Sequence, residues 1–178
     1  MCSLLKSRYR IESVRLSGYD YASGGKYFIT ICTKNKIPYF GKIKNGKMIL
    51  SDIGQIVDQF WKEMPLHFDK IHLDEYIIMP NHIHGIIIVE TPNLGVSTST
   101  SPKQIHEKPP TNWKSNSIGL IINQFKRICT IKIKTSGFEF SWQPRYFDHI
   151  IRTKPELNRI RKYIKENPQN CYRKVILH

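Results

Sequence analysis

The feature that most constrains this chain is the segment 76–90, Tyr-Ile-Ile-Met-Pro-Asn-His-Ile-His-Gly-Ile-Ile-Ile-Val-Glu. Two aliphatic runs separated by a Pro-Asn dipeptide are typical of two short buried strands joined by a tight connection. Side chains alternate between the faces of a strand, so His82 and His84 share one face while Ile83 points toward the core on the other. The sequence therefore predicts two imidazoles side by side on a rigid element.

Two interpretations of this pair stay open on these residues alone. Each neutral imidazole offers one nitrogen along a fixed direction, so His82 and His84 are suitable ligands for a divalent metal. Histidines in strands are also common as half-buried aromatic residues whose nitrogens bond the backbone or water. Other residues of the chain are needed to distinguish a metal site from two histidines with a purely structural role.

The charge of the chain points to a polyanionic partner. Lysine and arginine together number 28 against 14 acidic residues, which gives a net charge of +14 over 178 residues. Nucleic acid is the first expectation from such a balance. A membrane surface is the rival, but no segment approaches the roughly 20 apolar residues of a spanning helix. The length predicts a single domain covering residues 1–178.

The N-terminus and the cysteines point to the cytoplasm. The first ten residues contain no apolar core of signal-peptide length, so a cytoplasmic protein is expected. The four cysteines are far apart and form no C-x-x-C pair, which favours neither a zinc knuckle nor a disulfide framework.

Local patterns predict an α+β fold, a ferredoxin-like antiparallel sheet with two helices packed on one face. An Asn-Gly dipeptide at 45–46 predicts a hairpin turn. The segments expected to be β-like are 26–33, 39–44, 48–50, 70–79, 82–90 and 138–151. Three helices are predicted. The first has its cap at Ser51 or Asp52 and ends at Met64-Pro65, and the second has its cap at Asn116 or Ser117. The third runs from Lys154 to Asn167 and is stopped by Pro168.

Two segments have a different composition. Residues 91–115 are rich in Ser, Thr, Pro, Asn and Lys and carry no core-forming period, which predicts a long flexible loop inside the domain. Residues 6–25 form a basic arm with tyrosines whose side chains could hold a phosphate backbone, although a solvated tail explains them as well.

The last helix carries a second group of residues. Tyr163 and Asn167 are one helical turn apart and share a face. Four lysines and arginines between 159 and 165 are expected to favour the phenolate of Tyr163, a competent nucleophile at phosphorus. A divalent cation held by His82, His84 and the Asn167 oxygen could polarise a phosphate that Tyr163 attacks. Alternatively, Tyr163 is a boundary aromatic and Asn167 a helix end, because the residues alone do not show that this helix meets the histidine strand.

Four blocks of sequence occur in order along the chain, namely Met79-Pro80-Asn81-His82-Ile83-His84-Gly85, Trp142-Gln143-Pro144-Arg145, His149-Ile150-Ile151-Arg152 and Tyr163-Ile164-x-x-Asn167-Pro168. Together they resemble the single-tyrosine HUH transposases, and most closely the REP-associated tyrosine transposase branch. The resemblance extends from about Ser17 to Tyr172. Residues 91–115 match no motif of the family, and Cys171-Tyr172 stands where a tryptophan is expected.

The resemblance implies a role for each matching residue. His82 and His84 would bind Mg²⁺ or Mn²⁺, Asn167 would be the third ligand, and Tyr163 would be the nucleophile. The implied reaction is cleavage of single-stranded DNA with a 5′-phosphotyrosine intermediate, followed by strand transfer. Hairpin-forming DNA is the implied substrate, and relatives act as monomers or homodimers.

The remaining expectations concern DNA contacts. Basic side chains in or near the matching blocks are the candidates for strand contacts, namely Lys126, Arg145, His149 and Arg152. Binding is expected to weaken with salt, because each neutralised phosphate releases counterions. The alternative function is a domesticated hairpin-binding protein that does not cleave, although such a protein has no need of a nucleophile.

Overall fold

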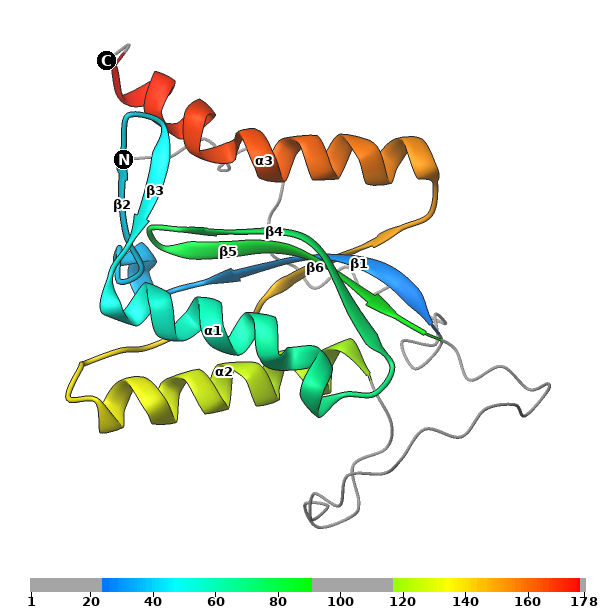
Figure 1. Cartoon of the computed structure of the whole chain (residues 1–178), viewed down its shortest axis with the longest axis horizontal. Helices are drawn as coiled ribbons and strands as arrows, with labels where there is room; N and C mark the ends of the chain where they lie inside the picture. The colour runs from blue at the N-terminus through cyan, green and yellow to red at the C-terminus, as the bar shows by residue number, and fades with distance from the viewer. Residues whose placement is uncertain (1–23, 91–116, 177–178) are drawn as a thin grey trace.

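A four-stranded antiparallel sheet is the centre of the fold (Figure 1). The structure, a computed structural model, describes residues 24–90 and 117–176. In spatial order the strands are β4 (Ile71–Met79), β5 (His82–Val89), β1 (Gly25–Cys32) and β6 (Phe147–Ile151). Every neighbouring pair of these strands is antiparallel. A separate hairpin of β2 (Gly41–Lys44) and β3 (Lys47–Leu50) follows a short 3₁₀ turn, η1 (Lys34–Lys36).

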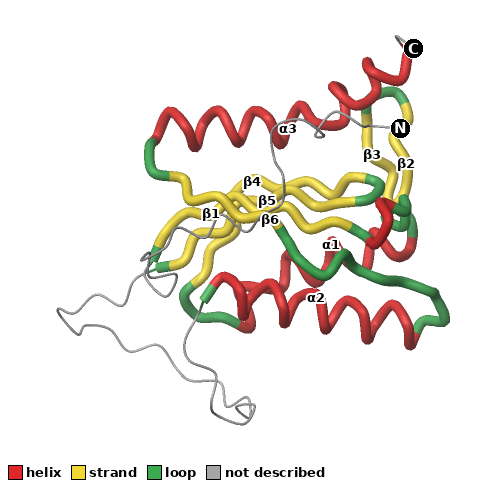
Figure 2. Tube along the Cα trace, turned by 180° about the vertical axis from the view of Figure 1, so that it is seen from behind, coloured by secondary structure: helices red, strands yellow, loops and turns green. Residues whose placement is uncertain are grey.

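Helices cover both faces of the sheet (Figures 1 and 2). Helices α1 (Asp52–His67) and α2 (Ile118–Thr135) lie side by side on one face, and α3 (Lys154–Ile176) crosses the other. The predicted α+β antiparallel sheet with two helices on one face is confirmed. The third helix is what closes the face that the histidines occupy.

Strand alternation produces two separate hydrophobic clusters. On β1, Tyr27, Ile29 and Ile31 are fully buried in the larger cluster beneath α1 and α2. Phe28, between them, packs on the other face against a smaller cluster that contains Ile164 of α3. The period of two in the strands therefore separates a wide core from a narrower α3 side.

Local signals set several element boundaries as predicted. Ser51 caps α1, where its Oγ accepts a hydrogen bond from the Gly54 N–H at 3.1 Å, and Ser117 caps α2. Asn45 and Gly46 have φ values of 51° and 71°, the left-handed pair that a tight hairpin turn requires. The predicted caps and the predicted turn are confirmed.

Both prolines expected to end helices lie inside them instead. Helix α1 continues past Pro65 to His67, and α3 continues past Pro168 to Ile176. A proline removes one hydrogen bond, but packing of the following turns can outweigh that loss. Beyond Pro168, Gln169 lies against Gly46 at the tip of the β2–β3 hairpin, which gives the extra turns of α3 a surface to pack on.

The predicted β-like run at 138–151 is a strand only from Phe147 to Ile151. Before it, Trp142 makes an isolated bridge with Thr33, and the Gln143 N–H donates to the Cys32 carbonyl at 2.9 Å. Pro144 has no N–H to continue a ladder, so this part of the run is a loop fastened to the end of β1.

Two expectations concern residues that the structure does not describe. The predicted flexible loop at 91–115 and nearly all of the basic arm at 6–25 lie outside the described residues. Within the described part, no helix is both long and apolar enough to cross a membrane.

Position 85, directly after the second histidine, requires glycine because of packing on the face of the sheet that α1 and α2 cover. A Cβ atom at Gly85 would lie 2.3 Å from the ring of the fully buried Trp61. We expect Gly85→Ala to lower the free energy of unfolding by about 1–3 kcal/mol, because the indole must move. Urea denaturation measures the loss. In a Trp61→Phe background the smaller ring leaves room, so the penalty of Gly85→Ala should shrink; an unchanged penalty would contradict the contact.

Candidate active site

The site forms where α3 crosses β5. The Oη of Tyr163 lies 3.3 Å from Nε2 of His84, although the two residues are 79 positions apart. Phe28 of β1 supports both rings, stacking on His84 at a centroid distance of 5.4 Å and meeting Tyr163 edge-on at 6.2 Å. The helix that carries the predicted nucleophile thus meets the histidine strand, which the sequence alone left open.

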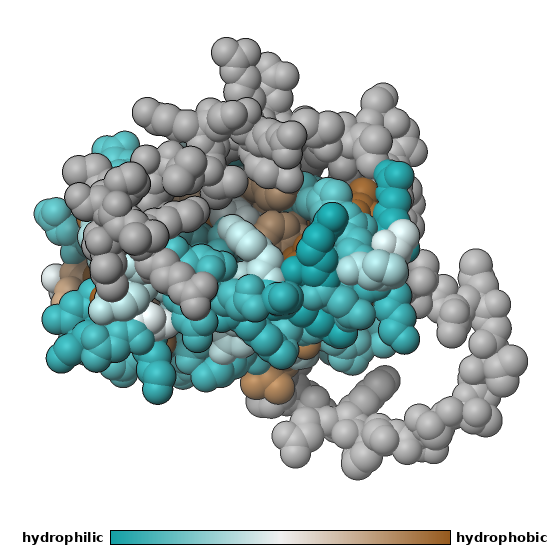
Figure 3. Space-filling view, turned by 90° about the horizontal axis from the view of Figure 1, so that it is seen from above, coloured by the Kyte–Doolittle hydropathy of each residue, from teal (hydrophilic) through white to brown (hydrophobic). Residues whose placement is uncertain are grey.

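The two histidines lie on the same face, as strand alternation predicts. The ring centroids of His82 and His84 are 4.5 Å apart. His84 is 2% exposed, His82 is half-buried at the start of β5, and Tyr163 is 40% exposed. The site is therefore closed beneath His84 and reaches the surface at Tyr163. The surface on the α3 side is predominantly hydrophilic where its described residues are visible (Figure 3).

A short hydrogen-bond chain fixes the proton on His82. The Nδ2 of Asn81 donates to the carbonyl oxygen of Lys36 at 3.1 Å, so Oδ1 is the free acceptor of that amide. This Oδ1 lies 2.7 Å from Nδ1 of His82, which must then carry the proton. The Nε2 of His82 is left with its lone pair, as a metal ligand requires.

His84 has a partner at each ring nitrogen. Its Nδ1 lies 2.9 Å from Oγ1 of Thr30, and its Nε2 faces Tyr163. If Tyr163 donates its hydroxyl proton to Nε2, Nδ1 carries the other proton and donates to Thr30. The same tautomer presents the Nε2 lone pair to a metal, so Thr30 can orient His84 as Asn81 orients His82.

Both imidazoles are neutral at pH 7. Burial, together with a smaller effect of the nearby Lys36 ammonium, lowers the pKa of His82 to about 4. Burial also holds the pKa of His84 well below its ordinary value, and repulsion from His82, when that residue is protonated, acts in the same direction. Neutral imidazole is the form that binds metals.

The third predicted ligand stands on α3. Asn167 is half-buried and follows Tyr163 by one turn of the same helix. Within residues 24–90 and 117–176, no group of three or more His, Cys, Asp and Glu side chains could hold a metal ion. If His82 and His84 bind a metal, a further ligand from this part of the chain is not a His, Cys, Asp or Glu side chain, and the predicted amide oxygen of Asn167 fits this condition.

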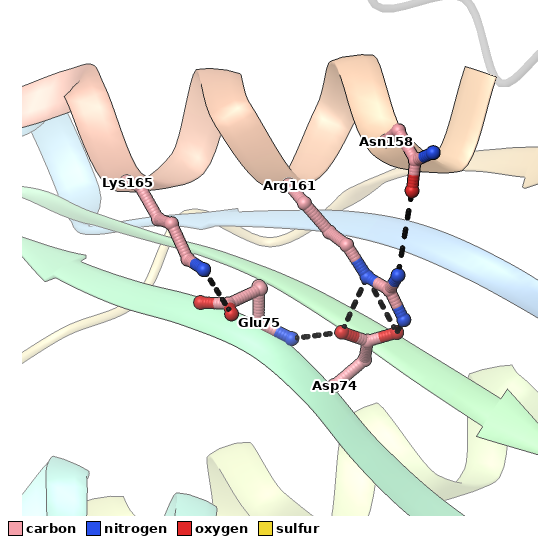
Figure 4. A network of polar contacts seen from close by, with 5 residues as sticks. All are labelled: Asp74, Glu75, Asn158, Arg161 and Lys165. Atoms are coloured by element: carbon pink, nitrogen blue, oxygen red, sulfur yellow. Dashed lines mark hydrogen bonds and ion pairs between the residues drawn. The ribbon is translucent and has the colours of Figure 1, made fainter. Parts of the chain in front are cut away.

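Two ion pairs fasten α3 to β4 (Figure 4). The Nε of Arg161 lies 2.9 Å from Oδ1 of Asp74 and its Nη2 lies 2.6 Å from Oδ2, while Lys165 lies 2.8 Å from Glu75. The pairing of β4 with β5 has a β-bulge between Leu73 and Tyr76. The bulge interrupts the alternation of side chains between the two faces of the strand, so the adjacent Asp74 and Glu75 both reach α3. Sequence analysis missed these acids; their signal was two adjacent carboxylates inside a hydrophobic strand.

These pairs correct the prediction of a positive field around Tyr163. Arg161 and Lys165 are each bound to a carboxylate, and Lys162 lies 3.8 Å from Glu166. Partial burial alone would raise the pKa of Asp74, but hydrogen bonds from Arg161 and from the Glu75 N–H outweigh it and leave that pKa below its ordinary value. Three of the four predicted cations, Arg161, Lys162 and Lys165, therefore have an acidic partner, while Arg159 is exposed. In the described part of the site, the tyrosine hydroxyl contacts His84.

Two of the four predicted DNA contacts are engaged within the protein. The Nζ of Lys126 donates to the carbonyl oxygens of Gln143 and Pro144 at 2.6 and 3.2 Å, and Nε2 of His149 lies 2.8 Å from Glu156. The other two predicted contacts, Arg145 and Arg152, have exposed side chains. Lys126 therefore has a structural role in holding the loop before β6.

The fold matches a solved structure of a REP-associated tyrosine transposase bound to a REP hairpin, with a TM-score of 0.58 and 18% identity, over 87% of this chain and 74% of that one. The chain therefore has a transposase-like fold. A solved structure of a candidate transposase from Deinococcus radiodurans R1 aligns with a TM-score of 0.45 and 13% identity, over 84% of this chain and 93% of that one.

In sequence, an uncharacterised protein of Haemophilus influenzae strain Rd is 40% identical over 159 residues, which cover 88% of this chain and 87% of that protein. The chain belongs to the same family as this protein. No family model matches the sequence.

The Arg161–Asp74 pair should control how firmly α3 rests on the sheet. We expect Arg161→Ala to raise amide hydrogen exchange in α3 several-fold, because Asp74 loses its partner in a partly buried place. Hydrogen exchange followed by mass spectrometry measures this effect. Arg159→Ala, an exposed cation of the same helix, is the matched control. Equal exchange in both variants would contradict the proposed anchor.

The neutral histidines predict a pH dependence of stability. As pH falls from about 6.5 toward 4, the unfolded chain binds protons at His82 and His84 that the folded chain does not, so stability falls. Replacing His84 with Gln should flatten this dependence in urea denaturation with EDTA, whereas replacing the exposed His67 should not. An equally steep dependence in the His84→Gln variant would contradict the assignment.

Proposed function

We propose that this protein is a metal-dependent endonuclease and strand transferase of single-stranded DNA that acts through Tyr163. The observation that carries the proposal is the meeting of Tyr163 with His84 at 3.3 Å beside a second neutral histidine. A nucleophile is expected to act within hydrogen-bond reach of the groups that serve it. The transposase-like fold agrees with this chemistry.

The donor set suits a small divalent cation. His82 and His84 present Nε2 atoms from one face of β5, each with its Nδ1 occupied by a neighbouring oxygen. Together with the Asn167 oxygen they would hold Mg²⁺ or Mn²⁺ through three neutral ligands, which leaves coordination positions for phosphate oxygens. The bound ion would polarise the scissile phosphate.

The covalent step follows from the position of the tyrosine. The Oη of Tyr163 forms a bond to phosphorus while the bond from phosphorus to the 3′-oxygen breaks. The hydroxyl of Tyr163 loses one proton and the departing 3′-oxygen gains one, so the step is balanced. Because the phosphodiester energy is retained in the 5′-phosphotyrosine, the reverse attack by a 3′-hydroxyl can join strands without another energy source.

The proposed substrate is single-stranded DNA that forms hairpins. The net charge of +14 suits a nucleic acid, and the transposase with the matching fold was solved bound to a REP hairpin. The protein would act as a monomer or a homodimer. Movement of its own gene and cleavage of dispersed repeats are both compatible with this chemistry.

A covalent-adduct assay tests the proposal. Purified protein is mixed with labelled hairpin DNA from beside its gene, with Mg²⁺, Mn²⁺ or EDTA, and the products are separated by denaturing electrophoresis. We expect an adduct with metal and none with EDTA. Tyr163→Phe should reduce the adduct by roughly 10³-fold or more, because it removes the nucleophile. Tyr172→Phe, on the same helix, is the matched control and should retain the adduct.

Two outcomes would contradict the proposal. An undiminished adduct in Tyr163→Phe would assign the nucleophile elsewhere. Tight binding of the hairpin without any adduct in the wild-type protein would favour the alternative, a hairpin-binding protein that does not cleave.

A further inference from the structure

A hollow lies beside the candidate active site, between the η1 turn and the loop before β6. This open surface depression of about 430 Å³ is lined by Lys34, Asn35, Lys36, Gln143 and Pro144. All five lining residues are neutral or positively charged. Neither the nucleophile nor the metal ligands explain the Trp142-Gln143-Pro144-Arg145 block, which forms one side of the hollow.

The η1 side has an unusual backbone. Asn35 and Lys36 have φ values of 53° and 57°, a left-handed conformation that residues other than glycine rarely adopt in succession. Hydrogen bonds hold the turn in place, from the Lys34 N–H to the Ser141 carbonyl at 2.9 Å and from Thr33 Oγ1 to the Ile37 carbonyl at 2.8 Å. Strain maintained in this way is typical of ligand-binding segments.

The loop before β6, on the opposite side of the hollow, is also held by hydrogen bonds and packing. Lys126 donates to the carbonyls of Gln143 and Pro144, and the indole N–H of Trp142 donates to the Lys126 carbonyl at 3.1 Å. The ring of Trp142 packs against Phe40 and Phe125 in the large core. The loop is therefore preorganised, and its shape does not depend on a ligand. The Ser141 carbonyl, which accepts from the Lys34 N–H, places this loop next to the η1 turn.

The hollow is connected to the first histidine. The carbonyl oxygen of Lys36 accepts from Asn81, whose Oδ1 in turn accepts from His82. The lysine ammonium acts in the same region, because it contributes to the lowered pKa of His82. A ligand that occupies the hollow would thus lie next to the residue that begins the candidate metal site.

We propose that this hollow is a subsite for single-stranded DNA, which binds one nucleotide and its phosphate next to the nucleotide that carries the reacting phosphate. The ammonium groups of Lys34 and Lys36 suit the phosphate, and the amides of Asn35 and Gln143 can donate to and accept from a base edge. The depression is open to solvent, as suits one nucleotide of a continuous strand. This inference rests on the proposed function, since it takes its substrate class from there.

The test measures DNA binding without chemistry. Fluorescence anisotropy in EDTA follows two labelled probes, a hairpin with six-nucleotide single-stranded extensions on both ends and the same hairpin without extensions. We expect Lys34→Ala/Lys36→Ala to weaken binding of the extended probe roughly tenfold or more and to lower its salt dependence by about two phosphate contacts. Binding of the hairpin without extensions should change by less than about twofold.

Matched variants separate the subsite from general charge. Lys132→Ala/Lys134→Ala also removes two exposed cations, both from α2, and should leave both probes unaffected. Lys34→Arg/Lys36→Arg keeps the charges and should retain binding of the extended probe. The subsite is wrong if Lys34→Ala/Lys36→Ala binds the extended probe like the wild-type protein, or if it weakens both probes equally.

The outcomes for the subsite and for the proposed function are distinguishable. An adduct in the wild-type protein together with unchanged binding in Lys34→Ala/Lys36→Ala would leave the function standing and remove the subsite. Selective loss of the extended probe in that variant, with no adduct in the wild-type protein, would retain a strand-binding site in a protein that does not cleave.

Discussion

The candidate site depends on the docking of α3 across the sheet. Apolar contacts of Leu157 and Ile164 and the ion pair of Arg161 with Asp74 hold the helix on the face that carries the histidines. The ion pair is partly buried and bidentate, so it fixes orientation as well as distance. Because Tyr163 lies directly before Ile164, burial of that isoleucine places the tyrosine ring at the edge of the contact, against His84.

The two faces of the sheet differ in the side chains that they carry. Beneath α1 and α2 the strands present an almost wholly apolar core, in which Trp61 packs so closely that position 85 has no room for a side chain. The other face has a smaller apolar cluster, and polar groups occupy the remaining positions. A large core on one side thus allows the buried His84 and the half-buried His82 to be accommodated on the other, where each Nδ1 has a polar partner.

The candidate site consists mainly of neutral side chains held in fixed orientations, and a strong positive electrostatic field is not its main feature. Burial keeps His82 and His84 uncharged, and Asn81 and Thr30 hold their Nδ1 atoms. Most of the positive charge expected around Tyr163 is paired with acids, whereas Lys34 and Lys36 line the hollow beside His82. Positive charge that suits a phosphate backbone is therefore present near His82, where the Lys36 ammonium favours the uncharged form of that candidate ligand.

The sequence by itself determined what short-range geometry controls. Strand alternation placed His82 and His84 on one face, and the caps at Ser51 and Ser117 and the turn at Asn45-Gly46 followed from local hydrogen bonding and allowed φ values. Only the tertiary structure decided that α3 continues past Pro168, that Asp74 neutralises Arg161, and that Tyr163 meets His84. These features depend on packing between segments distant in sequence, whose free energies outweigh local propensities and leave no periodic pattern along the chain.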